Sequence, residues 1–334
     1  MPRLAHVTGV YELPAELQVT PSCFAKSFPV KVGSFTGTVT LPRPEWRDER
    51  PHFVAPAMDP NVEPYIRQIV DAKHGWEAFD YWGRVSRYNP SERKILRAHL
   101  GAILLTCKLD PAAITYSDYL HGRGHPQGSA IQELFQRIDD WFEQIRTWVE
   151  TALDQDADPH HALLAPRLQA AGLHVLTVEG STVSLPAHAS RIFATLSTYE
   201  PLSLSLLRKI MQRVNAGSVP SDAQLFLRDS RAELRRGRYR RAVIDAGSAT
   251  EITLADFNQR VTRVTIPLRG ATLGWYATQS AIVAQAHLPA HIMADLVTIR
   301  NSAIHHNRIP TQTEAARAVA LAKQVVDRLD PLPL

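Results

Sequence analysis

The spacing of apolar residues changes along the chain, and this change constrains the fold more than any other feature. Within the first forty residues, the segments HVTGVYELP, AELQVT, FPVKV and SFTGTVTL are rich in Val, Thr and aromatic residues and are broken by Pro and Gly, which is typical of β-strands. From residue 223 onward, apolar residues recur every three or four positions, which is typical of helices. The sequence therefore predicts an α+β protein, with a mixed β-rich and helical N-terminal region followed by an all-α C-terminal helical bundle.

The N-terminal region after the first strands has a mixed pattern. Three prolines are expected to interrupt regular structure: Pro42, Pro44 and Pro51. Apolar residues at helical spacing predict three helices, over Val62–Ala72, Ser91–Cys107 and Ala130–Leu153. Ser91 is a suitable N-cap residue for the second of these helices. The later segment LHVLTVEGSTVSLP predicts a β-hairpin that turns at Glu179-Gly180.

Loop-forming residues suggest where the chain divides. The segment NAGSVPS, residues 215–221, separates two helical patterns. We therefore expect an N-terminal α+β region over residues 1–200, a helix and linker over 201–221, and a helical domain over 222–334. The first region can be divided again into a strand-rich segment, 1–57, and a helical segment, 60–200. Five helices are predicted in the last domain, over Ala223–Arg236, Tyr239–Thr262, Trp275–Ala286, Ala290–His305 and Thr313–Leu329.

Composition narrows the class of protein. Among the 334 residues, 45% are apolar and 21% are charged, a globular balance that excludes a wholly disordered chain. Two cysteines cannot build a disulfide scaffold or a four-thiolate zinc site, which indicates a reducing compartment. The longest strongly apolar run, Leu100–Cys107, is too short to cross a bilayer, and no signal-peptide core is present. We therefore expect a cytoplasmic protein with no membrane partner, whose net charge of +4 mildly favours polyanions.

The segment RNSAIH, Arg300 to His305, carries the clearest chemistry in the sequence. Arginine offers a planar fork that can bind a phosphate at two points, and histidine exchanges protons near neutral pH. These two groups suffice for RNA cleavage without a metal or any other cofactor. A base removes the 2′-hydroxyl proton, the oxygen attacks the adjacent phosphorus, and a cation stabilises the charge that develops on the phosphate.

The spacing within RNSAIH sets a geometric condition. Five residues at about 100° each place Arg300 and His305 about 140° apart on an ideal helix, whereas Asn301 and His305 share a face. Arg300 and His305 can converge only if the helix ends near His305 or if a second subunit completes the site. Asn307 and Pro310 are suitable stop signals. A purely structural interpretation also exists, in which Arg300 pairs with Asp295 and His305 serves as a helix C-terminal residue.

In this helical frame the segment resembles the HEPN superfamily, the "higher eukaryotes and prokaryotes nucleotide-binding" domains. Members share an Arg-x4-6-His motif near the end of the penultimate helix, commonly with a polar residue after the Arg. RNSAIH fits this motif, with Asn301 in the polar position. The preceding stretch AELRRGRYRRAVIDAGSATEITLADF is similar to the family's first helix, tight turn and second helix. The resemblance covers about the last third of the chain.

The resemblance implies a domain that forms a homodimer, brings two RNSAIH segments into one basic cleft and cleaves RNA. It makes Arg300 the contact to the scissile phosphate and His305 the general acid or base, with Asn301 orienting them or binding substrate. Glu251 lies where members often carry an acidic residue and would hold Arg300, and His306 would be a spare proton carrier. Many members act as toxins, in abortive infection or in CRISPR systems. We therefore expect an anti-phage effector that is controlled by an antitoxin or an activating partner.

A run of arginines precedes the predicted second helix of this domain. Seven arginines between residues 228 and 241 stand against only Asp229 and Glu233. We expect some of them to contact RNA phosphates, with an aromatic side chain available for stacking. These candidate substrate-binding residues are Arg235, Arg238, Arg241 and Tyr239. The alternative interpretation is a solvated helix face.

Other histidines do not predict a metal site. The loop HGRGHPQG, residues 121–128, and the pair His160-His161 lack an accompanying Cys pair or HExxH motif, so no metal ligands are assigned. Two further hypotheses on function stay open beside the endoribonuclease. One is a non-catalytic, HEPN-like scaffold that binds a nucleotide or RNA. The other is an RNA-binding regulator that acts through the β-rich N-terminal region.

Overall fold

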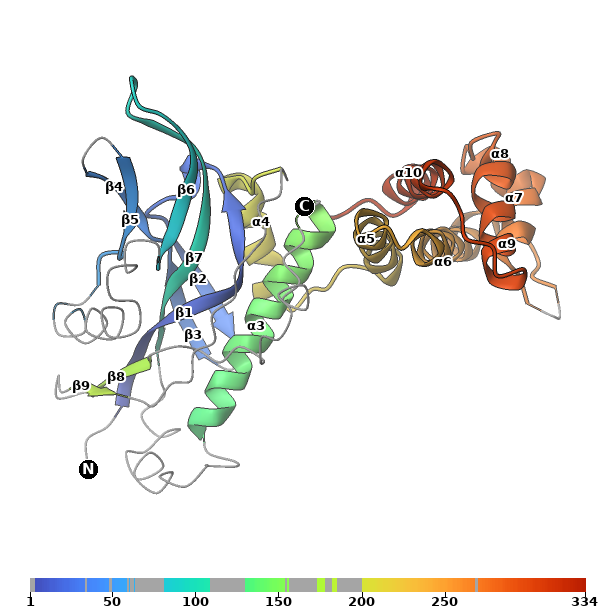
Figure 1. The fold of residues 1–334 in the computed structure, drawn as a ribbon. Coiled ribbons are helices and arrows are strands. Elements are labelled where there is room, and N and C mark those ends of the chain that lie inside the picture. Colours follow the sequence, from blue (N-terminus) through green and yellow to red (C-terminus); the bar gives the residue numbers. More distant parts are fainter. Residues whose placement is uncertain are drawn as a thin grey trace. The chain divides into compact units, whose positions relative to one another are not determined.

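A computed structural model describes residues 4–33, 35–47, 50–58, 60, 63, 81–108, 130–153, 155, 173–177, 182–184, 200–267 and 270–334. The chain separates into two compact units (Figure 1). The first unit comprises Met1–Val149 and Ala157–Val219, and the second comprises Glu150–Asp156 and Pro220–Leu334. Strands gather in the first unit and the second is built of helices, which confirms the predicted α+β class.

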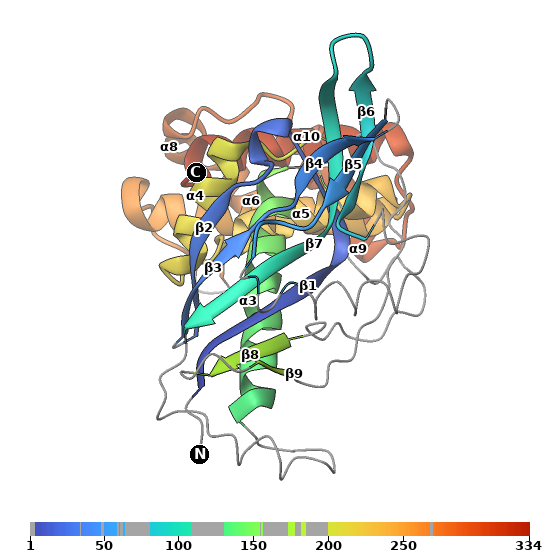
Figure 2. The ribbon, with the colours of Figure 1, turned by 90° about the vertical axis from the view of Figure 1, so that its left-hand side faces the viewer.

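The first unit is built on a seven-stranded sheet (Figure 2). Its strands are β1 (Leu4–Val19), β2 (Ser27–Val32), β3 (Phe35–Thr40), β6 (Gly83–Asn89), β7 (Lys94–Lys108), β8 (Leu173–Thr177) and β9 (Thr182–Ser184). The order is β2-β3-β7-β1-β8-β9, and β6 pairs with β7. All of these pairings are antiparallel. The strands predicted in the first forty residues and the later hairpin are thereby confirmed, with the two earliest segments joined in β1 across an irregularity between Glu12 and Leu17.

The predicted helix over Ser91–Cys107 is wrong, because these residues form most of strand β7. β7 pairs with β1 on one side and with β3 and β6 on the other. Its apolar run Leu100–Cys107 is buried along almost its whole length. A strand covered on both faces needs no alternation of polar and apolar residues, so its pattern cannot be told from that of a buried helix.

Two of the three prolines expected to break regular structure lie inside strands. β4 (Arg43–Arg47) and β5 (Arg50–Val54) form a separate two-stranded sheet that contains Pro44 and Pro51. A ribbon of two strands has a free edge on each side, where the missing N–H of proline breaks no ladder hydrogen bond. Pro42 lies outside regular structure, as expected.

Helices cover one face of the sheet of the first unit. α3 (Ala130–Ala152) matches the predicted helix, and α4 (Leu204–Asn215) follows Ser203, whose hydroxyl caps it by accepting from Leu206 N. Trp141, Phe142 and Ile145 of α3 meet Leu207 and Met211 of α4 over the sheet. A short 3-10 helix, η1 (Pro21–Cys23), joins β1 to β2. The predicted helix Val62–Ala72 and the histidine-containing loops at 121–128 and 160–161 lie outside the described residues.

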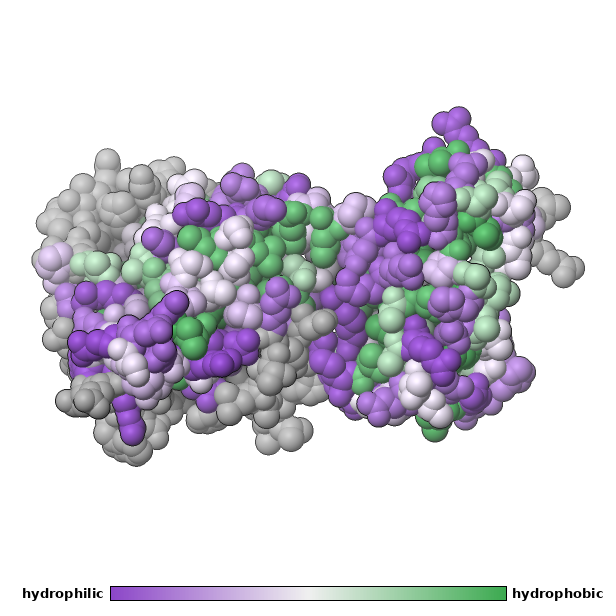
Figure 3. Space-filling model, turned by 90° about the horizontal axis from the view of Figure 1, so that it is seen from above, coloured by the Kyte–Doolittle hydropathy of each residue, from purple (hydrophilic) through white to green (hydrophobic). Residues whose placement is uncertain are grey.

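The second unit is a bundle around one apolar core. Its helices are α5 (Asp222–Arg235), α6 (Tyr239–Phe257), the π-helix η4 (Asn258–Thr262), α7 (Leu273–Thr278), α8 (Ser280–Gln285), the π-helix η5 (Met293–Thr298), α9 (Ile299–His305) and α10 (Gln312–Leu329). Alanines of α6 and α10 are almost fully buried, so these two helices pack closely. On the face of this unit seen in Figure 3, hydrophilic residues predominate, with apolar residues scattered among them.

The predicted helices of the second unit are confirmed with three differences. The helix expected over Tyr239–Thr262 is α-helical to Phe257 and continues as the π-helix η4. The single helix expected over Trp275–Ala286 is divided at Gln279, which is extended, while the Thr278 hydroxyl donates back to the carbonyls of Gly274 and Trp275. The helix expected over Ala290–His305 contains the π turn η5, in which the Thr298 hydroxyl donates to Met293 O over 2.8 Å. A π turn changes the backbone hydrogen bonds of a helix but leaves the spacing of apolar residues nearly the same, so the sequence does not reveal it.

Candidate active site around Arg300 and His305

Helix α9 ends at His305, which meets the geometric condition set by the sequence. Asn307 adopts the left-handed conformation with φ of 52°, and the backbone N–H groups of His306 and Arg308 both donate to Ser302 O. Arg240 of α6 donates from Nε to Ala303 O over 2.9 Å, which satisfies a carbonyl of the last turn. The chain around His305 is therefore fixed by both its own turn and a neighbouring helix.

Arg300 lies across α6 at a glycine. A Cβ atom added to Gly247 would lie 2.8 Å from Cγ of Arg300, so only glycine allows the side chain to lie this close to the helix. One turn further along α6, Glu251 Oε2 lies 3.1 Å from Nη2 of Arg300. The side chains of Arg300 and Glu251 retain 18% and 29% of their exposure, so the ion pair is accessible from one side. The expected contact between Glu251 and Arg300 is present.

The position of Glu251 is fixed from a second direction. Its Oε2 accepts a hydrogen bond from Leu273 N at the start of α7, over 3.1 Å. Glu251 also acts on Tyr276 of α7. Burial first, and then the negative charge of Glu251, raise the pKa of the Tyr276 hydroxyl. Within the described part of the chain, Nε of Arg300 is buried without a hydrogen-bond partner. Arg300 therefore uses part of its fork on Glu251, while its Nε lies against Gly247.

The alternative partner proposed for Arg300 is wrong. Asp295 pairs with Arg317 of α10, with Nη1 to Oδ1 at 3.4 Å, and not with Arg300. Asp295 lies in the π turn of η5, which changes the angular relation between its side chain and the residues of α9. Asp295 and Arg300, five residues apart in the sequence, therefore form no ion pair with each other.

Three further candidate residues at this end of α9 face solvent. Asn301, His305 and His306 are all exposed. Asn301 and His305 lie four residues apart on α9 and so share a face. Among the described residues, neither makes a side-chain hydrogen bond, so both are available to a ligand. His306 follows the end of the helix as its C-cap residue.

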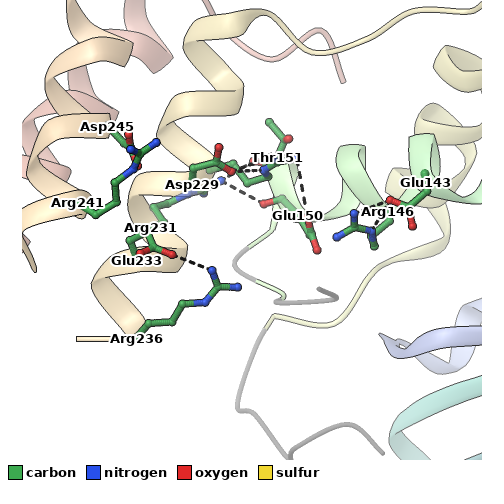
Figure 4. A network of polar contacts seen from close by, with 11 residues as sticks. Glu143, Arg146, Glu150, Thr151, Asp229, Arg231, Glu233, Arg236, Arg241 and Asp245 are labelled. Carbon is green, nitrogen blue, oxygen red and sulfur yellow. Dashed lines mark hydrogen bonds and ion pairs between the residues drawn. The ribbon is translucent and has the colours of Figure 1, made fainter. Parts of the chain in front are cut away.

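Most of the arginine run forms ion pairs and hydrogen bonds within the second unit, three of which are drawn in Figure 4 for Arg231, Arg236 and Arg241. Arg231 donates to the carbonyls of Glu150 and Thr151, and so caps the last turn of α3 that belongs to this unit. Arg236 pairs with Glu233 at 2.8 Å, and Arg241 pairs with Asp245 at 2.7 Å. Burial raises the pKa of the Asp245 carboxyl, while the hydrogen bond and charge of Arg241 oppose this rise.

The four predicted substrate-binding residues differ in their surroundings. Arg235 is exposed, and Arg238 is 64% exposed at 3.5 Å from Glu233. Arg241 is 61% exposed despite its pair with Asp245, so it can still contact an anion. Tyr239 is half-buried against the core of the unit, which favours a packing role over stacking on a base. The arginine of the run that hydrogen-bonds to α9 is Arg240, which was not among the predicted site residues.

The described residues were searched for a metal site and for a membrane-spanning helix. In that part of the chain, no group of three or more His, Cys, Asp or Glu side chains is arranged to hold a metal ion. Likewise, no helix in it is long and apolar enough to cross a membrane.

Comparisons with known proteins give no independent identification. No protein-family model matches the chain, and neither the curated proteins nor the solved structures contain a match. The interpretation of the site therefore depends on its own geometry and on the sequence motif.

Proposed function

We propose that the second unit is a metal-independent endoribonuclease of the HEPN type, with Arg300 and His305 as its catalytic residues. The observation that carries this proposal is the end of α9 at His305. It leaves the imidazole exposed in the last turn of the helix, while Arg300 is fixed on α6 by Gly247 and Glu251. A fixed cation and an accessible proton carrier on one short helix are the two groups that 2′-hydroxyl attack requires.

In the proposed reaction, His305 accepts the proton of a 2′-hydroxyl, and the 2′ oxygen forms a bond to the adjacent phosphorus. The bond between that phosphorus and the 5′ oxygen breaks, and the departing oxygen takes up a proton. The part of the Arg300 guanidinium that stays exposed binds the phosphate oxygens on which negative charge develops. Asn301, on the face of His305, orients the substrate. The products are a 2′,3′-cyclic phosphate and a 5′-hydroxyl.

We further propose that two copies of the chain form the complete site. Arg300 and His305 diverge by about 140° on an ideal helix, so a second RNSAIH segment can supply the group that one copy directs away from the phosphate. An uncontrolled ribonuclease would damage its own cell. This favours a toxin or anti-phage effector that an antitoxin or an activating partner controls, with the first unit as its sensing or binding region.

One observation favours a non-catalytic alternative. Arg300 is only 18% exposed and already has a carboxylate partner, which is also what a structural arginine would show. In this alternative the helical unit binds a nucleotide or RNA, or acts as a scaffold, and the Arg300–Glu251 pair only joins α9 to α6. The two functions differ in one requirement: RNA cleavage needs the His305 imidazole, and a scaffold does not.

Cleavage of a labelled RNA by the full-length protein in EDTA tests the proposal. We expect His305→Ala and Arg300→Ala each to lower the rate by about 100-fold or more, because each removes a group that acts in the transition state. His306→Ala is the matched control, since it removes an exposed neighbouring imidazole, and it should retain most of the activity. Equal activity of the wild type and His305→Ala would support the scaffold instead.

A further inference from the structure

Positive charge gathers on one hairpin of the first unit, far along the sequence from RNSAIH. The β6–β7 hairpin projects beyond the rest of its sheet (Figures 1 and 2). Residues 83–100, which span β6, the turn and the first half of β7, contain five cations and one carboxylate, Glu92. The cations are Arg84, Arg87, Arg93, Lys94 and Arg97. This segment thus has a formal charge of +4, equal to that of the whole chain.

Two of these arginines face each other across the hairpin. Arg87 of β6 is the register partner of Arg97 of β7, at a point where the pairing shifts register on both sides of Arg87. Directly opposed residues have Cβ atoms about 5 Å apart, and like charges in this position destabilise a strand pair. Within the described part of the chain, neither forms an ion pair. On the same hairpin, burial, followed by the charges of Arg84 and Arg97, lowers the pKa of His99 to about 4.

The β4–β5 ribbon places aromatic side chains beside these charges. The Trp46 and Tyr88 rings are 5.9 Å apart and meet edge to face, and the Arg93 guanidinium lies 5.7 Å from the centre of the Trp46 ring. Both rings are only half-buried. Glu45, the residue before Trp46, pairs with Arg43 at 2.9 Å and Arg47 at 3.7 Å. The acidic side chain nearest to Trp46 in sequence therefore does not neutralise the hairpin.

We propose that this basic hairpin surface, formed by Arg84, Arg87, Arg93, Lys94 and Arg97 with Trp46 and Tyr88, binds single-stranded RNA. Arginine forks match phosphate oxygens, and half-exposed aromatic rings offer a face on which a base stacks. The cost of opposing Arg87 and Arg97 is recovered when a phosphate lies between them. This site is separate from RNSAIH, and it does not depend on cleavage by the second unit.

An anionic membrane is the competing partner for a basic surface. Membrane attachment by a surface element requires a substantial apolar face in addition to positive charge. Of the described residues of the hairpin, Leu96 is the large apolar residue that is exposed, at 40%. Hydrophilic residues gather where Figure 3 looks down on the hairpin tip. One leucine among five cations favours a hydrated polyanion over a lipid surface.

Fluorescence anisotropy with a labelled single-stranded oligouridylate tests this site. The full-length protein carries His305→Ala, which preserves the RNA, and binding is measured in EDTA over a range of salt concentrations. The test variant is Arg87→Gln/Arg97→Gln, and Arg87→Lys/Arg97→Lys keeps the charge. The matched control is Lys26→Gln/Lys31→Gln, which removes two exposed cations at β2 of the same unit.

We expect the glutamine pair to weaken binding at least about tenfold, and to lower the slope of log affinity against log salt by about 1.4, or about 0.7 per lost phosphate contact. The lysine pair should retain most of the affinity and the control should match the parent. The glutamine pair should lose RNA affinity by the same factor in a protein that also carries Arg300→Ala. This result would show that the hairpin binds RNA independently of the proposed cleavage site. Removing two opposed like charges should not lower the melting temperature, so a folding defect is recognisable.

Three results would overturn the proposal. The first is unchanged RNA affinity in the glutamine pair, and the second is an equal loss in the Lys26/Lys31 control. The third is unchanged RNA affinity together with lost binding to phosphatidylserine vesicles, which would identify the surface as a membrane contact. If wild-type protein cleaves no RNA but the hairpin variants still lose RNA affinity, the cleavage proposal fails while this one stands.

Discussion

Gly247 and Glu251 lie one turn apart on α6, and Arg300 contacts both. The missing side chain at the first position allows the arginine to lie against the helix, and the carboxylate at the second orients its guanidinium. Neither contact alone would fix a long, flexible side chain. Together they fix the guanidinium of Arg300 on the helix that ends at His305. Substitutions at these two positions of α6 should therefore change the cleavage activity proposed for α9.

Gly247→Ala should separate positioning from stability. The new Cβ would lie 2.8 Å from Arg300 Cγ, which must move. A displacement of the order of 1 Å at a positioned group can cost about 100-fold in rate, so we expect cleavage to fall at least about tenfold. The melting temperature should change little, because alanine is favoured in a helix by about 0.5–1 kcal/mol and this offsets the contact.

Gly274→Ala provides the control for this experiment. Its Cβ would make only an ordinary contact, 3.5 Å from Val297 Cγ1, so we expect both activity and melting temperature to be retained. Cleavage by Gly247→Ala at the wild-type rate would contradict the positioning of Arg300 by α6. Enzyme kinetics and thermal unfolding on the same preparations give both readouts.

Arg300, Asn301 and His305 were predicted from a motif with fixed spacing, and Glu251 from the resemblance to HEPN domains. Sequence reasoning could not locate the residues that depend on packing between helices. Gly247 was visible only as a small residue on a helix face, and Arg240 only as one of seven arginines. Their contacts to α9 arise from residues more than fifty positions away, and no local pattern encodes such a distance.

At the scale of elements, helix α3 packs a carboxyl group against the central sheet. The Tyr11 hydroxyl of β1 donates to Asp139 Oδ1 over 2.9 Å. Burial raises the pKa of Asp139 to about 7, and the charges of Asp140 and Glu143 add to this, while the bond from Tyr11 opposes it. Between about pH 4 and pH 7, Asp139 is therefore protonated in the folded state, whereas it is ionised in the unfolded chain. Stability falls as the pH rises through this window.

Asp139→Asn should remove this pH dependence. The amide oxygen can still accept from Tyr11, and no charge has to be buried. With allowance for solvent screening, we expect the variant to exceed the wild type by about 1 kcal/mol at pH 8, or about 2–4 °C in Tm, with a smaller difference at pH 5. Glu92→Gln, which removes an exposed carboxyl elsewhere in the same unit, is the control. A stability difference that does not grow from pH 5 to pH 8 would contradict this account.

Elements with one buried face were predictable from sequence, and those buried on both faces were not. The amphipathic pattern gave α3, α5, α6 and α10 their approximate bounds, and the Thr311–Glu314 capping box marks the start of α10 as expected. Strand β7 was mistaken for a helix because successive residues on both of its faces are buried, which removes the alternation that marks a strand. The π turn of η5 likewise depends on tertiary packing around α9.

At the scale of the whole molecule, the chain consists of two units with different charged features. The first unit presents a basic hairpin beside half-exposed aromatic rings, and the second presents an arginine and a histidine at one helix end. The change in apolar spacing near residue 223 was sufficient to predict the α+β class. It could not predict the sheet order of the first unit, which depends on pairings between strands as distant as β1 and β8.

The central claim is that Arg300 and His305 direct cleavage by the 2′-hydroxyl, and the chemistry of the RNA ends tests it most directly. RNA treated with the full-length protein in EDTA is analysed by mass spectrometry, beside the His305→Ala variant. We expect fragments with a 2′,3′-cyclic phosphate and a 5′-hydroxyl, which disappear with the variant. Fragments that carry a 5′-phosphate, or cyclic ends that persist with His305→Ala, would contradict the account.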